Sequence, residues 1–429
     1  MPTDLRDKLR RLGVHKGAAN IGRPSRSTAR GEEEKGRHKG GIESLVDGRL
    51  IDTPHGPTFV HEDVFPIEYV HGSHTLGEFV SLSPIVAAQI ANDPSLAEID
   101  LGRAAFLDTE TTGLAGGTGT FAFLVGVGAL DSGQSSFVVR QYFLRSPAEE
   151  PAMLYALAEH LDAFAAVVSF NGRGFDMPLL ESRFTLARMR PRILRAPHLD
   201  LLLPARRVWR GRLESCALSS LEHHILNVRR EQADVPGFLI PAMYVNYVRT
   251  GDASEMPRVL YHNMLDILSM VSLSTRLITL FGASPDAGSS SLAVGAGDWL
   301  ALGKWHADHE RAADAEAALR SCLAAGPDPA LRAFAWHRLG HLLKQYDRRA
   351  EALRIWEALS DAPGSLGVEA CVELAKHYEW QDVNLERALV WTQEAIAIVA
   401  SMPEGYLRDE LDAELSHRRR RLSRKRERA

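Results

Sequence analysis

Three apolar segments joined by short turns constrain the fold of this chain more than any other feature. They are rich in Val, Phe, Leu and Ala, and they occupy residues 104–110, 121–130 and 135–144. Antiparallel strands accept tight connections, whereas parallel strands need long crossovers. The sequence therefore predicts an antiparallel meander of three strands.

The elements that follow this meander alternate between helical and strand patterns. A helix is expected at 149–164, a strand at 166–170, a helix at 176–189, a strand at 198–205, and further helices at 217–226 and 257–281. Strands this apolar have to be covered on both faces. The order therefore predicts an α/β domain in which a mixed sheet is flanked by helices.

Length and composition divide the chain into several parts. A length of 429 residues allows two or three domains. We expect a disordered basic arm at 1–45, a lead-in segment packed on the core at 46–100, the α/β domain at 101–282, a Gly/Ser/Ala/Asp linker at 283–297, helical repeats at 298–415 and a basic tail at 416–429. The lead-in segment is expected to form a hairpin and a helix.

The helical part contains an internal repeat. Residues 302–324, 339–360 and 374–397 align at spacings of 37 and 35 residues. Small residues recur at equivalent places, namely Gly303, Gly340 and Ala375 in the first helices and Ala315, Ala352 and Ala388 in the second. Such helix pairs resemble tetratricopeptide repeats, of which three are about the minimum for a stable stack. A generic helical bundle is the alternative.

Two carboxylates end the first strand of the meander. Asp108 and Glu110 are two residues apart, so both side chains project from the same face of the strand. Adjacent like charges cost energy unless a cation compensates for them, and oxygen ligands suit Mg²⁺ or Mn²⁺. The motif indicates a divalent metal site, with a pair of solvated acids at a strand end as the alternative.

Two further acids are candidates for the same site. Asp176 begins the helix at 176–189, where the helix dipole also favours a negative charge. Asp266 lies between Leu265 and Ile267 on an apolar helix, where a carboxylate needs a partner or a metal. Each position fits either a metal ligand or a structural role.

The motifs around these four acids resemble the DEDD superfamily of 3′–5′ exonucleases. The strings DTETTGLAGGTGTFAFLVGVG (108–128), SFNGRGFDMPLLESR (169–183), HLDLLLPARRVW (198–209), LSSLEHHIL (218–226) and YHNMLDI (261–267) resemble its YprB-like ribonuclease H-like branch. The resemblance implies a ribonuclease H-like fold and a 3′–5′ exonuclease that acts on single-stranded RNA or DNA. It also implies that Asp108, Glu110, Asp176 and Asp266 hold two Mg²⁺ or Mn²⁺ ions for a two-metal mechanism.

The last motif departs from the superfamily pattern. The superfamily places Tyr four residues, or His five residues, before the final acid. In this chain His262 is four residues before Asp266, and Tyr261 is five before it. His262 lies one helical turn from Asp266 and is the catalytic candidate, with a half-buried structural histidine as the alternative. The exchange also favours a second hypothesis, a nucleic-acid-binding or scaffold protein with a weakly active or inactive nuclease domain.

Six residues are candidate contacts to nucleic acid. They are Thr109, Asn171, Arg173, Arg206, Arg207 and Trp209. Asn171 either positions the substrate or holds its turn, and Arg173 either meets a phosphate or is solvated. Arginines beside an aromatic residue suit single-strand gripping and stacking, although a solvated basic helix face has the same composition.

Charge and cysteine usage suggest partners and a compartment. The net charge of −5 combines strongly basic ends, at 1–40 and 417–429, with an acidic body. Such ends either grip phosphate backbones or are simply solvated. Three separated cysteines, no CxxC, no long uncharged apolar run and no apolar leader favour a cytoplasmic protein without membrane contact. The repeats suggest an additional protein partner.

Overall fold

The computed structural model describes residues 41–113, 119–131, 133–231, 234–283 and 294–428. In these residues a seven-stranded sheet has the order β1-β2-β7-β6-β5-β8-β9. The strands are β1 (Gly48–Thr53), β2 (Gly56–Pro66), β5 (Ala104–Thr111), β6 (Ala122–Leu130), β7 (Ser136–Phe143), β8 (Ala166–Ser169) and β9 (His198–Asp200). β8 pairs in parallel with β5 and β9, whereas all other pairs are antiparallel. The predicted meander and the mixed sheet are confirmed.

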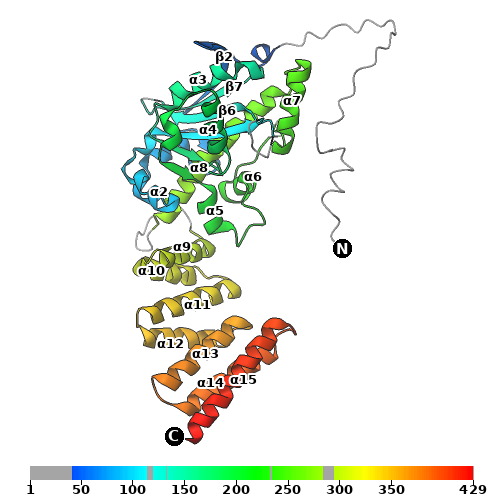
Figure 1. Ribbon diagram of the computed structural model, residues 1–429. Helices are drawn as coiled ribbons and strands as arrows, with labels where there is room; N and C mark the ends of the chain where they lie inside the picture. The colour runs from blue at the N-terminus through cyan, green and yellow to red at the C-terminus, as the bar shows by residue number, and fades with distance from the viewer. Residues whose placement is uncertain (1–40, 114–118, 132, 232–233, 284–293, 429) are drawn as a thin grey trace, which may run out of the picture. The chain divides into compact units, whose positions relative to one another are not determined.

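Helices cover both faces of this sheet (Figure 1). Neighbouring residues of β5 point to opposite faces: Phe106 belongs to one buried core and Leu107 to the other. The Phe106 core includes residues of α2 (Pro84–Ala91), α5 (Leu202–Trp209) and α8 (Met256–Phe281). The Leu107 core includes residues of α3 (Glu150–Leu161), α4 (Asp176–Leu186) and α7 (Ile240–Thr250). The hydrophobic strands are thus shielded from water on both sides.

The long helix α8 crosses the sheet at close range because β6 carries glycines beneath it. A Cβ atom at Gly126 would clash with Asn263 and Ile267, and one at Gly128 would clash with Ile267. This close approach brings the polar residues of α8 onto the end of β5. α8 is also long and apolar enough to cross a membrane, but 78% of its most apolar window is buried within the protein, as in a core helix.

The expected boundaries need four corrections. The strand expected at 198–205 ends at Asp200, because the Asp200 carboxylate accepts a hydrogen bond from the Leu202 N–H (3.0 Å) and helix α5 begins. The lead-in hairpin, β1 and β2, is part of the main sheet. Ile42, expected in the disordered arm, is fully buried, whereas 1–40 lie outside the described residues. α9 starts at Ala296, inside the expected linker.

The helical part consists of three consecutive helix pairs and a final long helix. The helices are α9 (Ala296–Asp308), α10 (Ala312–Ala324), α11 (Pro329–Gln345), α12 (Arg349–Leu359), α13 (Ser365–Trp380), α14 (Leu385–Ala400) and α15 (Tyr406–Glu427). The recurring alanines are fully buried, and a Cβ at Gly303 or Gly340 would clash with Leu319 or Trp356 of the paired helix. Small residues therefore set how closely the paired helices approach, as the repeat pattern predicts.

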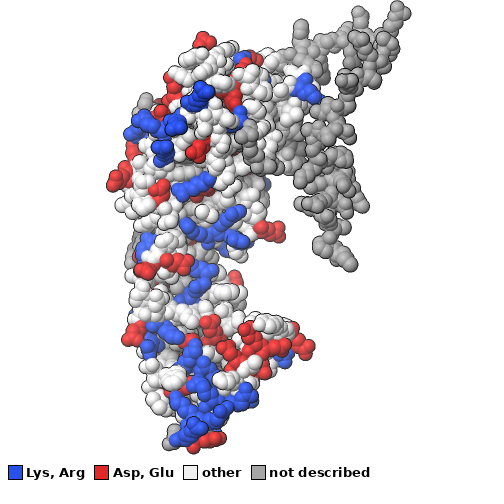
Figure 2. All heavy atoms as spheres, viewed as in Figure 1, with Lys and Arg blue, Asp and Glu red and all other residues white. Residues whose placement is uncertain are grey.

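Residues 416–427 of the expected basic tail form the second half of helix α15, which packs mainly on α14 and contacts α13 through side chains. Leu415 and Leu422 are buried against the preceding helices. The buried carboxylate of Glu379 on α13 forms a two-pronged ion pair with Arg421, and Lys425 and Arg418 lie 3.5 and 3.6 Å away. Lys and Arg side chains gather over this part of the molecule, at the bottom of Figure 2. The cluster of positive charge is therefore anchored by one buried acid.

Replacing Glu379 by Gln is expected to destabilise the α13–α15 contact by about 2 kcal/mol at neutral pH, because it removes charge-assisted hydrogen bonds. Burial by itself would raise the pKa of Glu379, but the hydrogen bonds and charges of Arg421, Lys425 and Arg418 lower it below its usual value. A lowered carboxyl pKa contributes stability above the unfolded-state pKa, and this stability is lost as the pH falls through the folded-state pKa. Urea unfolding followed by circular dichroism measures the difference.

The difference between Glu379→Gln and the wild type should therefore shrink as the pH is lowered from about 7 to below 4. Glu410→Gln, at an exposed position of α15, is the matched control and should unfold like the wild type. A constant difference at all pH values would show that the ion pairs do not stabilise this contact.

Candidate metal centre

Three elements bring the four predicted carboxylates to one place. β5 provides Asp108 and Glu110, the first turn of α4 provides Asp176, and α8 provides Asp266. Thr109 donates a hydrogen bond from its hydroxyl to Asp176, which ties α4 to the strand. From α8, the Asn263 amide donates to Asp108 at 2.7 Å. The sequence-distant acids therefore meet at the end of β5.

Burial raises the pKa of all four carboxylates, and repulsion from neighbouring acids adds to the rise. Burial, followed by the charges of Asp266 and Asp176, raises the pKa of Asp108 well above its usual range. Burial and the charges of the other three acids do the same for Glu110. Burial raises the pKa of Asp176 to about 6. The pKa of Asp266 is also raised by burial, although Arg230 and His262 oppose the rise. The cluster holds more negative charge than its cationic neighbours compensate.

The donor set fits a hard divalent cation. Donor atoms of Glu110, His262 and Asp266 all lie within 4.8 Å of one another, and Asp108 and Asp176 are near enough for their charges to act on Glu110. Partly buried carboxylates that repel one another gain most from a bound cation, and oxygen-rich sites suit Mg²⁺ or Mn²⁺. The structure therefore contains acidic groups that could hold such an ion, without specifying which ion it is.

His262 is held with one ring nitrogen toward the acids. Its Nδ1 lies 2.8 Å from Asp234 Oδ1, while its Nε2 lies 3.6 Å from Asp266 Oδ2 and 3.9 Å from Glu110 Oε1. A carboxylate at one imidazole nitrogen fixes the orientation of the ring. Among the described residues, the group of close donor atoms includes His262 but not Tyr261. Of the two exchanged residues, His262 is therefore the one that lies at the cluster.

Arg230 is the most important residue of the site that the sequence reasoning missed. Its guanidinium forms ion pairs with Asp266, with the buried Glu222 (2.6 Å) and with Asp234 (3.2 Å). Only 14% of its side chain is exposed. Burial by itself would lower the pKa of Arg230. The ion pairs with Glu222 and Asp266 outweigh this effect and raise the pKa above its usual value, so the guanidinium stays charged. The loop that carries Arg230 has no periodic pattern that would predict its role. The sequence signal nearest to it was the motif at 218–226, which contains its ion-pair partner Glu222.

Asn263 was missed as well, although it lies in a motif that was recognised. It is fully buried, and its side-chain oxygen accepts a hydrogen bond from Gln141 of β7 at 2.8 Å. Its amide then donates to Asp108. The hydrogen bonds from Gln141 to Asn263 and from Asn263 to Asp108 hold the Asp108 carboxylate in place. A polar Asn263 one helical turn before the apolar Ile267 was the signal in the sequence that could have identified this residue.

Asn171 and Arg173 shape the loop that leads into α4. The Asp200 carboxylate accepts hydrogen bonds from the backbone N–H groups of Asn171 (2.8 Å) and Arg173 (3.0 Å). Asn171 has φ = 66°, a left-handed conformation that Asn tolerates better than most residues. The Arg173 guanidinium donates to the His198 carbonyl and lies 3.6 Å from Asp93. Of the two roles predicted for Asn171, the observed backbone contacts therefore support the one in which it holds the turn.

The prediction that Trp209 stacks on nucleic acid is wrong. Only 1% of Trp209 is exposed, and its Nε1–H donates to Asp298 of α9 at 3.2 Å. The Arg207 guanidinium donates to the Ile90 carbonyl at 2.8 Å, and both Arg206 and Arg207 are exposed. The Thr109 side chain is also buried and is engaged by Asp176. The amphipathic period of α5 indicated a basic face, but it did not reveal that α9 covers the tryptophan.

Comparison with known proteins agrees with this geometry. Residues 105–278 match the family model described as the RNase_H superfamily. That range contains all four carboxylates, His262, Arg230 and Asn263. The chain is also 28% identical to uncharacterized protein YprB of Bacillus subtilis (strain 168) over 351 residues, which are 80% of this chain and 82% of the relative. The predicted ribonuclease H-like domain is thus confirmed, and the similarity to YprB extends well beyond it.

Proposed function

Because residues 105–278 form a ribonuclease H-like domain, which supports a nuclease-type function in general, we propose that the protein is a metal-dependent nuclease. In detail, it is a 3′–5′ exonuclease on single-stranded RNA or DNA that uses two Mg²⁺ or Mn²⁺ ions. The observation that carries the proposal is the meeting of Asp108, Glu110, Asp176 and Asp266 at the end of β5.

Each side chain has a distinct task in this proposal. Asp108, Glu110, Asp176 and Asp266 hold the ions, which, when bound, activate water and stabilise the charge that develops on the phosphate. Asn263 and Thr109 keep two of the carboxylates in place. His262, oriented by Asp234, accepts a proton from the attacking water at Nε2. Arg230 balances the charge of Asp266 and the buried Glu222.

A nucleic-acid partner is also supported by positive charge outside the site. Arg419, Arg420, Arg424, Arg426 and Arg428 of the C-terminal region are exposed, as is Arg206 on α5. Lys and Arg side chains attract phosphate backbones in a salt-dependent manner.

We further propose that the helix pairs are tetratricopeptide-like and bind a protein partner, and that the protein acts in the cytoplasm.

A second candidate function is a nucleic-acid-binding or scaffold protein whose nuclease domain is weakly active or inactive. It is favoured by the ion pair between Arg230 and Asp266, because the guanidinium engages a carboxylate oxygen that an active site would offer to a metal. The exchanged order of His262 and Tyr261 points in the same direction. Under this hypothesis the protein binds oligonucleotides but cleaves them slowly or not at all.

Oligonucleotide cleavage separates the two functions. Single- and double-stranded RNA and DNA, labelled at either the 5′ or the 3′ end, are incubated with the full chain in Mg²⁺, Mn²⁺ or EDTA. We expect metal-dependent products that shorten stepwise from the 3′ end, and no cleavage in EDTA. Binding without cleavage on every substrate would support the second candidate, and internal cuts would show an endonuclease instead.

A further inference from the structure

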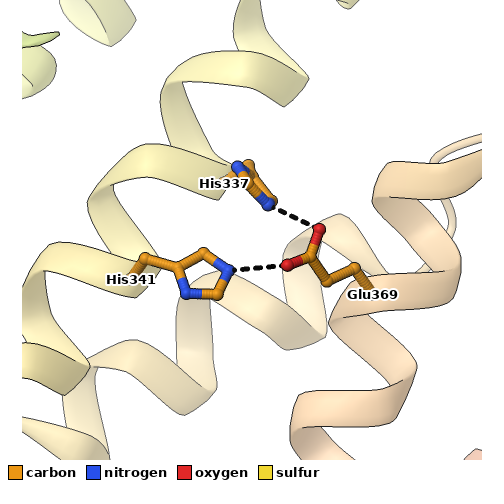
Figure 3. A group of neighbouring side chains, drawn as sticks. All are labelled: His337, His341 and Glu369. Atoms are coloured by element: carbon orange, nitrogen blue, oxygen red, sulfur yellow. Dashed lines mark hydrogen bonds and ion pairs between the residues drawn. The ribbon is translucent and has the colours of Figure 1, made fainter.

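Two histidines and a glutamate form a second group of metal-ligating side chains, far from the four carboxylates in sequence. His337 and His341 lie one turn apart on α11, and Glu369 lies on α13. Figure 3 shows both imidazoles pointing at the carboxylate, with each ring opposite one of its oxygens. His337 Nε2 is 2.8 Å from Oε2 and His341 Nε2 is 3.1 Å from Oε1. The group therefore joins the second and third helix pairs.

The donor atoms of the three side chains are close enough together to share one ion. The three donor atoms lie within 4.8 Å of one another. An ion with ligand bonds of about 2.0–2.1 Å holds tetrahedral donors about 3.3 Å apart. The two observed nitrogen–oxygen distances, 2.8 and 3.1 Å, are each to a different oxygen of Glu369 and are shorter than this separation by about 0.5 and 0.2 Å. Small side-chain rotations would thus suffice to admit an ion between the three donors.

His341 has an unused ring nitrogen that faces the group. Its Nε2 is shut off from solvent and has no hydrogen-bond partner within the part of the chain that the structure describes, because its contact with Glu369 has ion-pair distance but not hydrogen-bond geometry. A buried polar atom without a partner costs free energy. A metal ion is one partner that would satisfy it.

The three side chains face one another rather than other charged groups. The two imidazole rings have centroids 4.6 Å apart. The nearby Lys344 is engaged by Glu373, and the described ion-pair partners of Glu369 are the two histidines. The carboxylate is therefore open to a cation.

We propose that His337, His341 and Glu369 bind a transition-metal dication of the Zn²⁺ class, which links α11 to α13. Two imidazoles and one carboxylate suit Zn²⁺, Co²⁺ or Ni²⁺ better than Mg²⁺ or Ca²⁺. A fourth position is left for water or for a group from a partner. The bound ion stabilises the packing of the second helix pair on the third, since it binds only the folded arrangement.

The test uses the full chain, stripped with a chelator and then dialysed. Zn²⁺ is titrated calorimetrically into the wild type and into each variant. Because the carboxylate cluster can also take Zn²⁺, we expect His337→Ala and His341→Ala to bind one equivalent fewer than the wild type. The control His417→Ala, at an exposed position of α15, should bind like the wild type. In parallel, Co²⁺ should give the intense visible absorption of a four-coordinate ion.

Thermal unfolding gives an independent readout. Zn²⁺ is expected to raise the midpoint of the wild type and of His417→Ala, but not that of the two histidine variants. Glu369→Gln keeps the test informative if a histidine variant fails to fold, because 46% of the Glu369 side chain is exposed. Undiminished Zn²⁺ binding in all three ligand variants, or no Zn²⁺ binding by the wild type, would overturn the proposal.

Discussion

Asp108→Asn is expected to slow metal-dependent oligonucleotide cleavage by about a thousandfold or more, because the stabilisation supplied by a correctly held cation amounts to several kcal/mol. The amide keeps the shape of the side chain but removes one of the negative charges that attract the ion. Asn263 can still contact the new side chain, so the fold should be preserved. Initial rates with Mn²⁺ and with Mg²⁺ measure the effect.

Thermal unfolding in EDTA distinguishes this loss from misfolding. The pKa of Asp108 is raised by burial and by neighbouring acids, so its charged form destabilises the metal-free protein at neutral pH. Asp108→Asn should therefore unfold at the same temperature as the wild type or at a higher one. Glu98→Gln removes an exposed acid elsewhere and should alter neither property. An active Asp108→Asn protein would contradict the proposed metal centre.

Arg230→Ala is expected to lower the free energy of unfolding by about 3–5 kcal/mol at neutral pH, because removing one partner of a buried ion pair leaves an uncompensated charge. Glu222 is only 1% exposed and would lose its cation, as would Asp266. Urea unfolding in EDTA measures the change. Arg249→Ala, at an exposed position of α7, is the control and should change stability by less than about 0.5 kcal/mol.

Two additional measurements test the assigned cause. Adding Glu222→Gln to Arg230→Ala should restore part of the stability, since a neutral amide is less costly to bury than an unpaired carboxylate. Mg²⁺ or Mn²⁺ should stabilise Arg230→Ala more than the wild type, because the ion no longer competes with a guanidinium for Asp266. If Arg230→Ala unfolds like Arg249→Ala, Arg230 is not a structural counter-ion of the cluster.

The sequence predicted the elements that follow from local patterns. Runs of apolar residues gave the meander of β5, β6 and β7 and the helices α3, α4 and α8, since period and length of such runs are local properties. Spacing likewise placed Asp108 and Glu110 on one strand face. Local patterns failed where a distant segment decides the outcome: residues 416–427 belong to a helix that is docked through Glu379 of α13.

The amino-acid sequence by itself determined which four acids share the motifs of the site and which segments become most of the strands and helices. Tertiary structure alone decided what surrounds those residues. It placed Arg230 against Asp266, Asn263 against Asp108, and α9 over Trp209. These contacts join residues that are far apart in the chain or lie on different elements, so no short-range period encodes them. Whether an acid faces a metal, a guanidinium or solvent depends on packing, and packing is a property of the folded molecule as a whole.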